Sequence, residues 1–247
     1  DSLSVVQDYL LGPEVPAALR LTHLLNYDVG SHGRGAEGAA LWHTRTDRLE
    51  VAAATWGVPL VTVGSNLDAH YPRIGFLESV SMRNAAVPHL LSAGIGRVLV
   101  ASSQTFAFAG IDGEGDISRS DPMLLPLLST PALTQTAAHW GRTRVEKTLR
   151  LIGRPEAQYL DVCVRDVEGT PHNCGTCPKC LRTLVTIEVA GHLDEFCPSV
   201  FPLAPYLAAR DRYLGELLAR DSDFTRTMLA LAAHRGWRWV FSEHGRA

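Results

Sequence analysis

The sequence predicts an α/β fold, with a parallel Rossmann-like sheet flanked by helices, then a cysteine-rich segment and a C-terminal helical part. Short apolar runs alternate with amphipathic stretches through the first 155 residues, which is typical of parallel βαβ units. Four of the five cysteines lie between residues 163 and 180. Amphipathic helices are expected over residues 203–220 and 222–235. We therefore expect a first domain over residues 1–155 and a second part over 156–247.

The elements expected in the first domain alternate between helix and strand. Their spacing predicts helices over 2–11, 38–56 and 84–93, and strands over 20–27, 58–64 and 97–103. Further along the chain, Asp121-Pro122 is typical of a helix N-cap followed by proline at the first helical position. The run from Thr143 to Glu146 fits a capping box, which predicts a helix from there to about residue 152.

Polar residues follow each of these expected strands. Asp28 follows the first strand, residues 64–66 follow the second, and Ser102 lies at the end of the third. Ligands of an open parallel sheet bind beyond the carboxyl ends of its strands. These residues are therefore candidates for a ligand site.

Composition and charge limit the class of protein. With 247 residues, 46% of them apolar and 20% charged, the chain has the composition of an ordinary globular protein. Its net charge of −3 argues against nucleic acid as a partner. No apolar run approaches the ~20 residues that span a bilayer, and no secretory leader is recognisable. We expect a cytoplasmic protein that acts on a small-molecule substrate without a membrane partner.

The cysteines are spaced C-x10-C-x2-C-x2-C, at Cys163, Cys174, Cys177 and Cys180. Four thiolates complete the shell of a tetrahedral Zn²⁺ in a closed structural site. A helix is expected over residues 178–190, with proline at its start and glycine after its end. The sequence therefore predicts a structural zinc knuckle that is attached to an amphipathic helix.

Two alternatives to zinc stay open. The first is a pair of disulfides or buried free thiols, which a cytoplasmic chain disfavours. The second is an iron–sulfur cluster, because a C-x2-C-x2-C run also begins the bacterial ferredoxin motif. The last cysteine of that motif would fall at Leu184, so zinc is the better prediction.

The cysteine segment also resembles a known family. The run HNCGTCPKC, with Cys163 before it and Arg182 after it, is similar to the zinc knuckle of the 7-cyano-7-deazaguanine synthase branch of the PP-loop ATP pyrophosphatases. It departs from that pattern by one extra residue, Asn173. The resemblance implies a HUP-type parallel sheet.

Three weaker similarities occur in the order that this family has them. Asp1-Ser2 resembles the last two residues of the family's SGGxDS motif, and whether SGG precedes them stays open. Residues 80–84, VSMRN, resemble its VPGRN box, and the run TRVE at 143–146 resembles its TKxE segment. Arg144 then takes the place of a lysine that reaches the phosphates. The segment after residue 103 departs from the family's substrate segment, which implies a different substrate.

The resemblance implies an ATP-dependent ligase that releases pyrophosphate, with Mg²⁺ bound alongside the nucleotide. Ser2 and Arg144 would be its catalytic residues. The residues expected to bind nucleotide, metal or substrate are Asp1, Ser2, Asp28, Gly30, Arg83, Asn84, Ser102 and Asp121. For the Mg²⁺ ligand the choice between Asp121 and Asp112 stays open, and Asp121 could equally be only an N-cap.

Two other functions remain open at this stage. One is a sulfur transferase of the same superfamily in which the cysteines hold an iron–sulfur cluster. The other is a non-catalytic domain, stabilised by a structural zinc ion, that binds a nucleotide or nucleic acid. Whether the chain forms a homodimer is also left open by the sequence.

Overall fold

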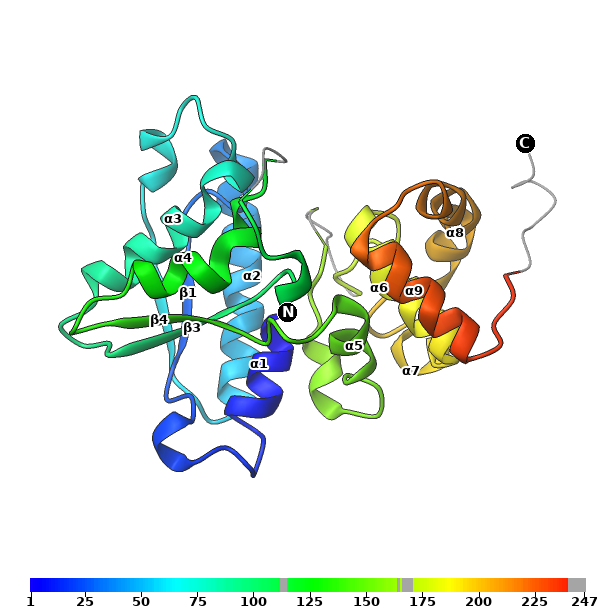
Figure 1. The fold of residues 1–247 in the computed structure, drawn as a ribbon, viewed down its shortest axis with the longest axis horizontal. Helices are drawn as coiled ribbons and strands as arrows, with labels where there is room; N and C mark the ends of the chain where they lie inside the picture. Colours follow the sequence, from blue (N-terminus) through cyan, green and yellow to red (C-terminus); the bar gives the residue numbers. More distant parts are fainter. Residues whose placement is uncertain (112–114, 164, 166–170, 240–247) are drawn as a thin grey trace. The chain divides into compact units, whose positions relative to one another are not determined.

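A computed structural model of the protein describes residues 1–111, 115–163, 165 and 171–239. The chain forms two compact units, Asp1–Arg142 and Thr143–Ala247, which are described separately below (Figure 1). The expected domain division at residue 155 would place helix α5, Arg144–Leu149, in the first domain. In the structure α5 packs against helices of the second unit, so that unit starts at Thr143.

The first unit contains four short strands in two parallel pairs. Strand β1, Leu24–Tyr27, pairs with β2, Leu60–Val63, and β3, Arg97–Ala101, pairs with β4, Thr134–Ala138. Within the described part of the chain, hydrogen bonds join the strands only within these pairs. The mixed α/β class is confirmed, but the described strands form two separate parallel pairs and do not show the full Rossmann-like sheet that was expected.

Four α-helices accompany these strands: α1 Ser2–Tyr9, α2 Gly35–Thr55, α3 Phe76–Leu90 and α4 Asp121–Leu127. Helix α4 packs on β4, α1 on β3 and α2 on β2, and α3 lies beside α4 (Figure 1). Between α3, α4 and β4 is a small apolar core of Ala85, Leu125 and Ala137. The β1–β2 and β3–β4 pairs are therefore each covered by helices.

Several boundaries differ from the expected ones. Strand β1 begins only at Leu24, because residues 17–19 form a turn of 3₁₀-helix. Helix α3 begins at Phe76 rather than at residue 84, since the Glu78 carboxylate accepts a hydrogen bond from the Gly75 amide at 2.7 Å and caps its first turn. Strand β4, with the sequence TQTAA, was not predicted.

The second unit is helical and is built around α6, Pro178–Ala190. Ten of the thirteen residues of α6 are buried, because α5, α8 (Leu203–Leu218) and α9 (Asp223–His234) all pack against it. A short helix, α7, Leu193–Phe196, follows α6. The predicted end of α6 is confirmed, because Gly191 adopts the left-handed conformation at φ 82°.

The capping box at the start of α5 is also confirmed. The Thr143 hydroxyl accepts from the Glu146 amide at 3.1 Å, and the Glu146 carboxylate accepts from the Thr143 amide at 2.6 Å. Among the described residues there is no helix with the length and apolar character to cross a bilayer.

Candidate functional sites

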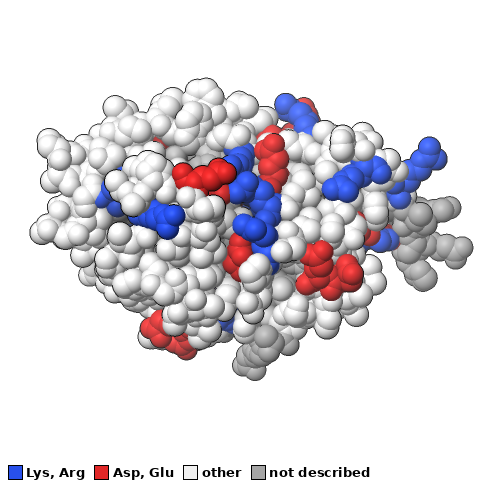
Figure 2. All heavy atoms as spheres, turned by 90° about the horizontal axis from the view of Figure 1, so that it is seen from below, with Lys and Arg blue, Asp and Glu red and all other residues white. Residues whose placement is uncertain are grey.

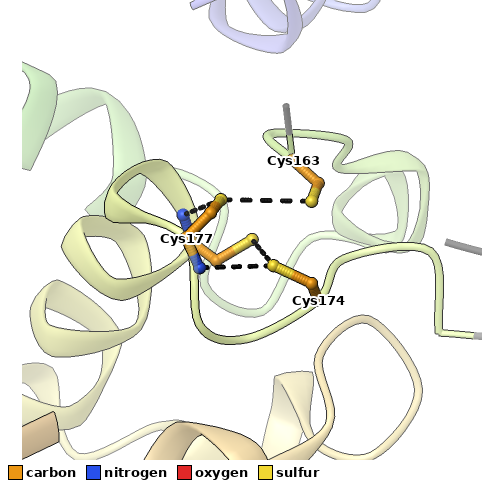
Figure 3. A group of neighbouring side chains, drawn as sticks. Cys163, Cys174 and Cys177 are labelled. Atoms are coloured by element: carbon orange, nitrogen blue, oxygen red, sulfur yellow. Dashed lines mark hydrogen bonds between the residues drawn. The ribbon is translucent and has the colours of Figure 1, made fainter. Parts of the chain in front are cut away.

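The four cysteines predicted to bind metal are brought together in the second unit. All four sulfur atoms lie within 4.8 Å of one another. The Sγ atoms of Cys163 and Cys177 are 4.0 Å apart, and those of Cys174 and Cys180 are 3.9 Å apart (Figure 3). Cys163, Cys177 and Cys180 are buried and Cys174 is half-buried. The cluster could hold a metal ion.

The sulfur separations provide a geometric test of fit. Sulfur atoms placed tetrahedrally about 2.3 Å from a central Zn²⁺ are separated by about 3.8 Å. The Cys163–Cys177 and Cys174–Cys180 sulfur separations, 4.0 and 3.9 Å, match that edge length closely. The donor set and its spacing therefore fit one tetrahedral ion, zinc or another metal that accepts four thiolates.

Backbone amides surround the sulfur atoms and fix their positions. The Cys177 amide donates to Cys174 Sγ at 3.2 Å, and the Cys180 amide donates to Cys177 Sγ at 3.5 Å (Figure 3). The turn between them needs Gly175, which has φ 71° and packs so closely that a Cβ would lie 3.1 Å from Pro202. Cys177 is the N-cap of α6, so the cluster is attached directly to the central helix.

The acidities of the thiols differ within the cluster. Burial raises the pKa of Cys163, and the hydrogen bond to Cys177 together with burial raises the pKa of Cys180. Burial also acts to raise the pKa of Cys174, but hydrogen bonds from Thr176 outweigh it and lower that pKa. Because thiols bind metal as thiolates, metal binding at the cluster would release their protons.

Asn173 connects the two parts of the cysteine cluster, a role that sequence reasoning missed. Its side-chain oxygen accepts from the amides of Val162 and Cys163, at 2.9 and 3.2 Å. Its side-chain nitrogen donates to the carbonyls of Leu160 and Val200, at 2.8 and 3.1 Å. Asn173 thus holds Cys163 beside the other three cysteines. Its position next to Cys174, as an extra residue in the cysteine pattern, is the sequence feature that could have indicated this role.

A second candidate site lies in the first unit, in a hollow of about 440 Å³. It is at the carboxyl ends of β1 and β2 and the start of α2, where parallel sheets bind ligands. The residues that line it are Asp28, Gly30, Gly33, Arg34, Gly35, Gly38, Ala39, Ser65, Asp68 and Ala69. Two of them, Asp28 and Gly30, were predicted from the sequence as binding residues.

The loop after β1 is folded tightly at this hollow. The Asp28 carboxylate accepts from the Gly30 amide at 3.1 Å, and the Ser65 hydroxyl donates to the Asp28 carbonyl at 2.6 Å. Gly30 has φ 99°, and a Cβ there would lie 2.7 Å from the Asp68 carboxylate and 2.8 Å from an Arg83 nitrogen. Glycine is required at this position both for its backbone angle and for space.

Arg83 was expected at a helix start, where it could meet phosphate or substrate, and the expected position at a helix start is wrong. Arg83 lies inside α3 and is only 1% exposed. Its guanidinium donates to the Asp68 carboxylate at 2.6 Å, to the Val29 carbonyl at 3.0 Å and to the Ser79 hydroxyl at 2.8 Å. Asn84 is also inside α3 and half-buried. Arg83 therefore holds in place, through hydrogen bonds, the segments around Val29 and Asp68 that border the hollow.

Asp68 is held between two arginines. The hydrogen bond from Arg34 and then that from Arg83 lower the pKa of its carboxyl group below the usual value. Arg34 is 65% exposed at the mouth of the hollow, whereas the Arg83 side chain is 1% exposed. Asp68 thus links a surface cation to a buried one.

Asp121 was expected to cap a helix or to bind Mg²⁺ or substrate. In the structure Ser120 is the N-cap of α4, and Asp121 is the first helical residue. Its buried carboxylate accepts a hydrogen bond from the Ser81 hydroxyl. Burial raises the pKa of Asp121 to about 6, and burial together with the Asp121 charge raises the pKa of Tyr27 to about 12. Asp112 lies outside the described residues.

The remaining predicted site residues belong to both units. Asp1 is the N-cap of α1, and Ser2 is its exposed first residue. Ser102 is buried at the end of β3, where its hydroxyl donates to the Gln104 carbonyl at 2.6 Å. Arg144 is the first residue of α5 in the second unit, and it is described together with Arg182 below.

Arg182, on α6, is near Arg144 within the second unit. Burial and the positive charge of Arg144 lower the pKa of Arg182 to about 10. Among the described residues its Nε atom is buried without a hydrogen-bond partner.

On the surface drawn in Figure 2, groups of basic side chains lie beside acidic ones, in keeping with the small net charge of −3.

Comparisons of this chain with protein-family models, with curated proteins and with solved structures found no match. The sites therefore have to be interpreted from their own geometry and chemistry.

Proposed function

We propose that this protein is an ATP-dependent adenylating ligase. A carboxylate or carbonyl oxygen of a small substrate would attack the α-phosphorus of ATP, forming an O–P bond while the bond to pyrophosphate breaks. An amine or ammonia would then attack the activated carbon and displace AMP. The observation that carries this proposal is the 440 Å³ hollow at the carboxyl ends of β1 and β2, beside the start of a 21-residue helix.

The hollow offers the groups that an adenosine moiety needs. Asp28 and Asp68 supply carboxylate oxygens that can accept from ribose hydroxyls, and the Ser65 hydroxyl is beside them. The glycines of the lining let backbone approach the ligand closely. Asp28 is assigned the ribose contact, because its contacts with the Gly30 amide and with His32 use Oδ1, whereas Arg34 and Arg83 occupy both oxygens of the Asp68 carboxylate.

The leaving pyrophosphate is assigned to amide donors of the first unit. The first turn of α1, with Ser2, offers backbone N–H groups. Arg144 lies in the second unit, and its contact with phosphate stays a prediction from the family resemblance. Mg²⁺ bound with ATP would spread the charge that develops on the departing phosphates. Asp121 is assigned to the substrate side, where a buried carboxylate with a pKa near 6 can exchange a proton near neutral pH.

The metal in the cysteine cluster is proposed to be zinc with a structural role. Four thiolates leave no open position for substrate, so the ion would organise the second unit and do no chemistry. The sulfur separations near 4 Å favour a single ion over an iron–sulfur cluster, whose several irons would hold the thiolates further apart. Metal analysis of the colourless protein should give one zinc per chain, whereas a brown, iron-containing protein would refute this assignment.

Substrate-dependent exchange of labelled pyrophosphate into ATP tests the function. We expect exchange with at least one member of a panel of small carboxylic acids, on the zinc-loaded full chain. The Asp28→Asn variant should raise the KM for ATP roughly tenfold, because a hydrogen bond to a charged group is lost. Asp47→Asn, on the exposed surface of α2, is the matched control and should leave the KM unchanged. Failure of the wild-type chain to bind ATP would refute the proposal.

A further inference from the structure

His139 joins helix α1 to the end of strand β4 within the first unit. It directly follows β4, and its side chain is only 8% exposed. Its Nδ1 atom lies 2.9 Å from the Ser4 hydroxyl, and its Nε2 atom lies 3.1 Å from the Asp8 carboxylate. Ser4 and Asp8 are about one turn apart on α1. A single imidazole ring therefore contacts two successive turns of this helix.

The backbone of His139 is held in a conformation that such a residue rarely adopts. Its φ is 60°, in the left-handed region that residues with a side chain seldom enter. A conformation of this kind persists only where the surrounding contacts hold it. The bonds with Ser4 and Asp8 do so, and Arg142 extends them, because its guanidinium donates to the same Asp8 oxygen at 2.6 Å. The end of β4 is thus connected to α1 through several polar groups.

The hydrogen atoms available at these contacts assign the charge of His139. The Ser4 hydroxyl has one hydrogen and donates it to the Asp1 carbonyl at 2.7 Å, so toward His139 its oxygen is an acceptor. The ionised Asp8 carboxylate also only accepts. Both ring nitrogens must then donate, which requires the protonated ring. In the neutral ring only one nitrogen donates, so either the Ser4–Asp1 bond or one bond of His139 is lost.

The charged and titratable groups around His139 act in opposite directions. Asp8 favours the protonated ring, and so does the Tyr9 ring on α1, whose centre is 5.6 Å from that of the imidazole. The positive charge of Arg142 and the burial of the His139 side chain oppose protonation. We therefore expect the ring to change charge within the range of about pH 5–8 in which histidine ordinarily titrates.

We propose that His139 is a pH-sensitive positioning residue. Its protonated ring holds α1 at the end of β4 and leaves the Ser4 hydroxyl on the Asp1 carbonyl, which closes the first turn of the helix. Loss of the proton as the pH rises removes one of these hydrogen bonds and loosens that turn. The effect on catalysis rests on the proposed function, which assigns the amides of this turn to pyrophosphate. The positioning role itself rests on the contacts of His139.

Hydrogen exchange of the full chain, followed from about pH 5 to about pH 8, tests this role without any nucleotide. After correction for the intrinsic pH dependence of exchange, the protection of the α1 amides should fall roughly fivefold or more as the pH rises, because a hydrogen bond is lost. The sign follows from the ring, since a proton that the folded state holds stabilises it at low pH and not at high pH. The amides of β1 and β2 should keep their protection.

Two variants connect this pH dependence to the ring. His139→Asn removes the ring but keeps a residue that adopts the left-handed conformation readily. Its α1 amides should be less protected at low pH, and their protection should no longer change with pH. Asp8→Asn should shift the midpoint of the change to lower pH, because a neutral amide favours the protonated ring less than a carboxylate does. His43→Asn, on the exposed surface of α2, is the matched control and should behave as the wild type does.

Two results would overturn the proposal. One is protection of α1 in the wild type that stays constant with pH, and the other is the same pH dependence in His139→Asn as in the wild type. If His139→Asn fails to fold, Asp8→Asn decides, because a midpoint equal to that of the wild type would show that the change in α1 does not come from the ring beside Asp8.

The outcome is distinguishable from that of the proposed function. If the protection of α1 depends on His139 and on pH but no acid supports exchange of pyrophosphate into ATP, the positioning role stands and the ligase function fails. If that exchange occurs while wild type and His139→Asn show equal protection of α1 at every pH, the function stands and the positioning role fails.

Discussion

Each of the two units is stabilised internally by buried polar groups, and the kind of group differs between them. In the second unit the cysteines lie within one short segment and meet at the start of α6. In the first unit the buried polar groups come from distant parts of the chain, as in the contacts of Arg83 with Asp68 and of Ser81 with Asp121. Local spacing therefore indicates the polar centre of the second unit, while that of the first depends on tertiary contacts.

The largest expected effect is on the second unit. Replacing Cys177 by serine, or removing the metal with a chelator, should unfold the unit, because structural zinc contributes about 10–16 kcal/mol of binding free energy in zinc-finger peptides. Cys197→Ser is the matched control, since Cys197 is outside the cluster.

The measurement is hydrogen exchange followed by mass spectrometry, which reports each unit separately. We expect protection to be lost in α6 and retained in β3 and β4. A chelated protein that keeps full protection in α6 would show that the cluster contributes no stability. Loss of protection in both units together would show that they unfold as one. The cysteine cluster would then not stabilise the second unit separately from the first.

The next effect is on the first unit. Arg83→Ala should lower the free energy of unfolding by about 3–5 kcal/mol, because it leaves the Asp68 carboxylate and the Val29 carbonyl without a buried donor. Arg34→Ala removes the other partner of Asp68, but Arg34 is exposed to solvent, so its expected cost is much smaller than that of Arg83→Ala. Urea unfolding of the two variants checks this difference. Equal costs would mean that burial does not decide the strength of the pair.

The sequence predicted those features that depend on local spacing. The cysteine cluster, the capping box at Thr143 and the end of α6 at Gly191 each depend on residues a few positions apart, and the structure confirms them. For the first unit the alternation of strand and helix predicted the α/β class, but not how far hydrogen bonds extend between strands.

Strand β4 illustrates why the rest could not be predicted. Its sequence, TQTAA, has little apolar character, and Gln135, its second residue, is fully buried. The Gln135 side-chain nitrogen donates to the Ala85 carbonyl at 3.4 Å and lies 3.1 Å from His89 Nε2, both on α3. A polar residue was therefore buried through partners about fifty positions away. Arg83 follows the same rule, because two of its acceptors, Val29 and Asp68, lie in segments that only the tertiary fold brings beside α3.

The smallest effect concerns the pH dependence of the first unit. The pKa of Asp121 is raised from its usual value of 3.8 to about 6, chiefly by burial. A carboxyl group with a raised folded-state pKa stabilises the fold at low pH, and that contribution is lost as the pH rises through 6. From pH 7.5 to pH 5 the wild type should therefore gain roughly 1–1.5 kcal/mol from this group.

Asp121→Asn should remove this gain, because an amide can still accept the Ser81 hydroxyl but does not titrate in this range. The measurement is the difference in unfolding free energy between wild type and variant at pH 5, 6 and 7.5, with Asp47→Asn, on the surface of α2, as the control. The difference should favour the wild type increasingly as the pH falls. A difference that stays constant with pH would mean that the Asp121 carboxylate is as well stabilised inside the unit as it is in water. Burial of this carboxyl group would then not destabilise the first unit at neutral pH.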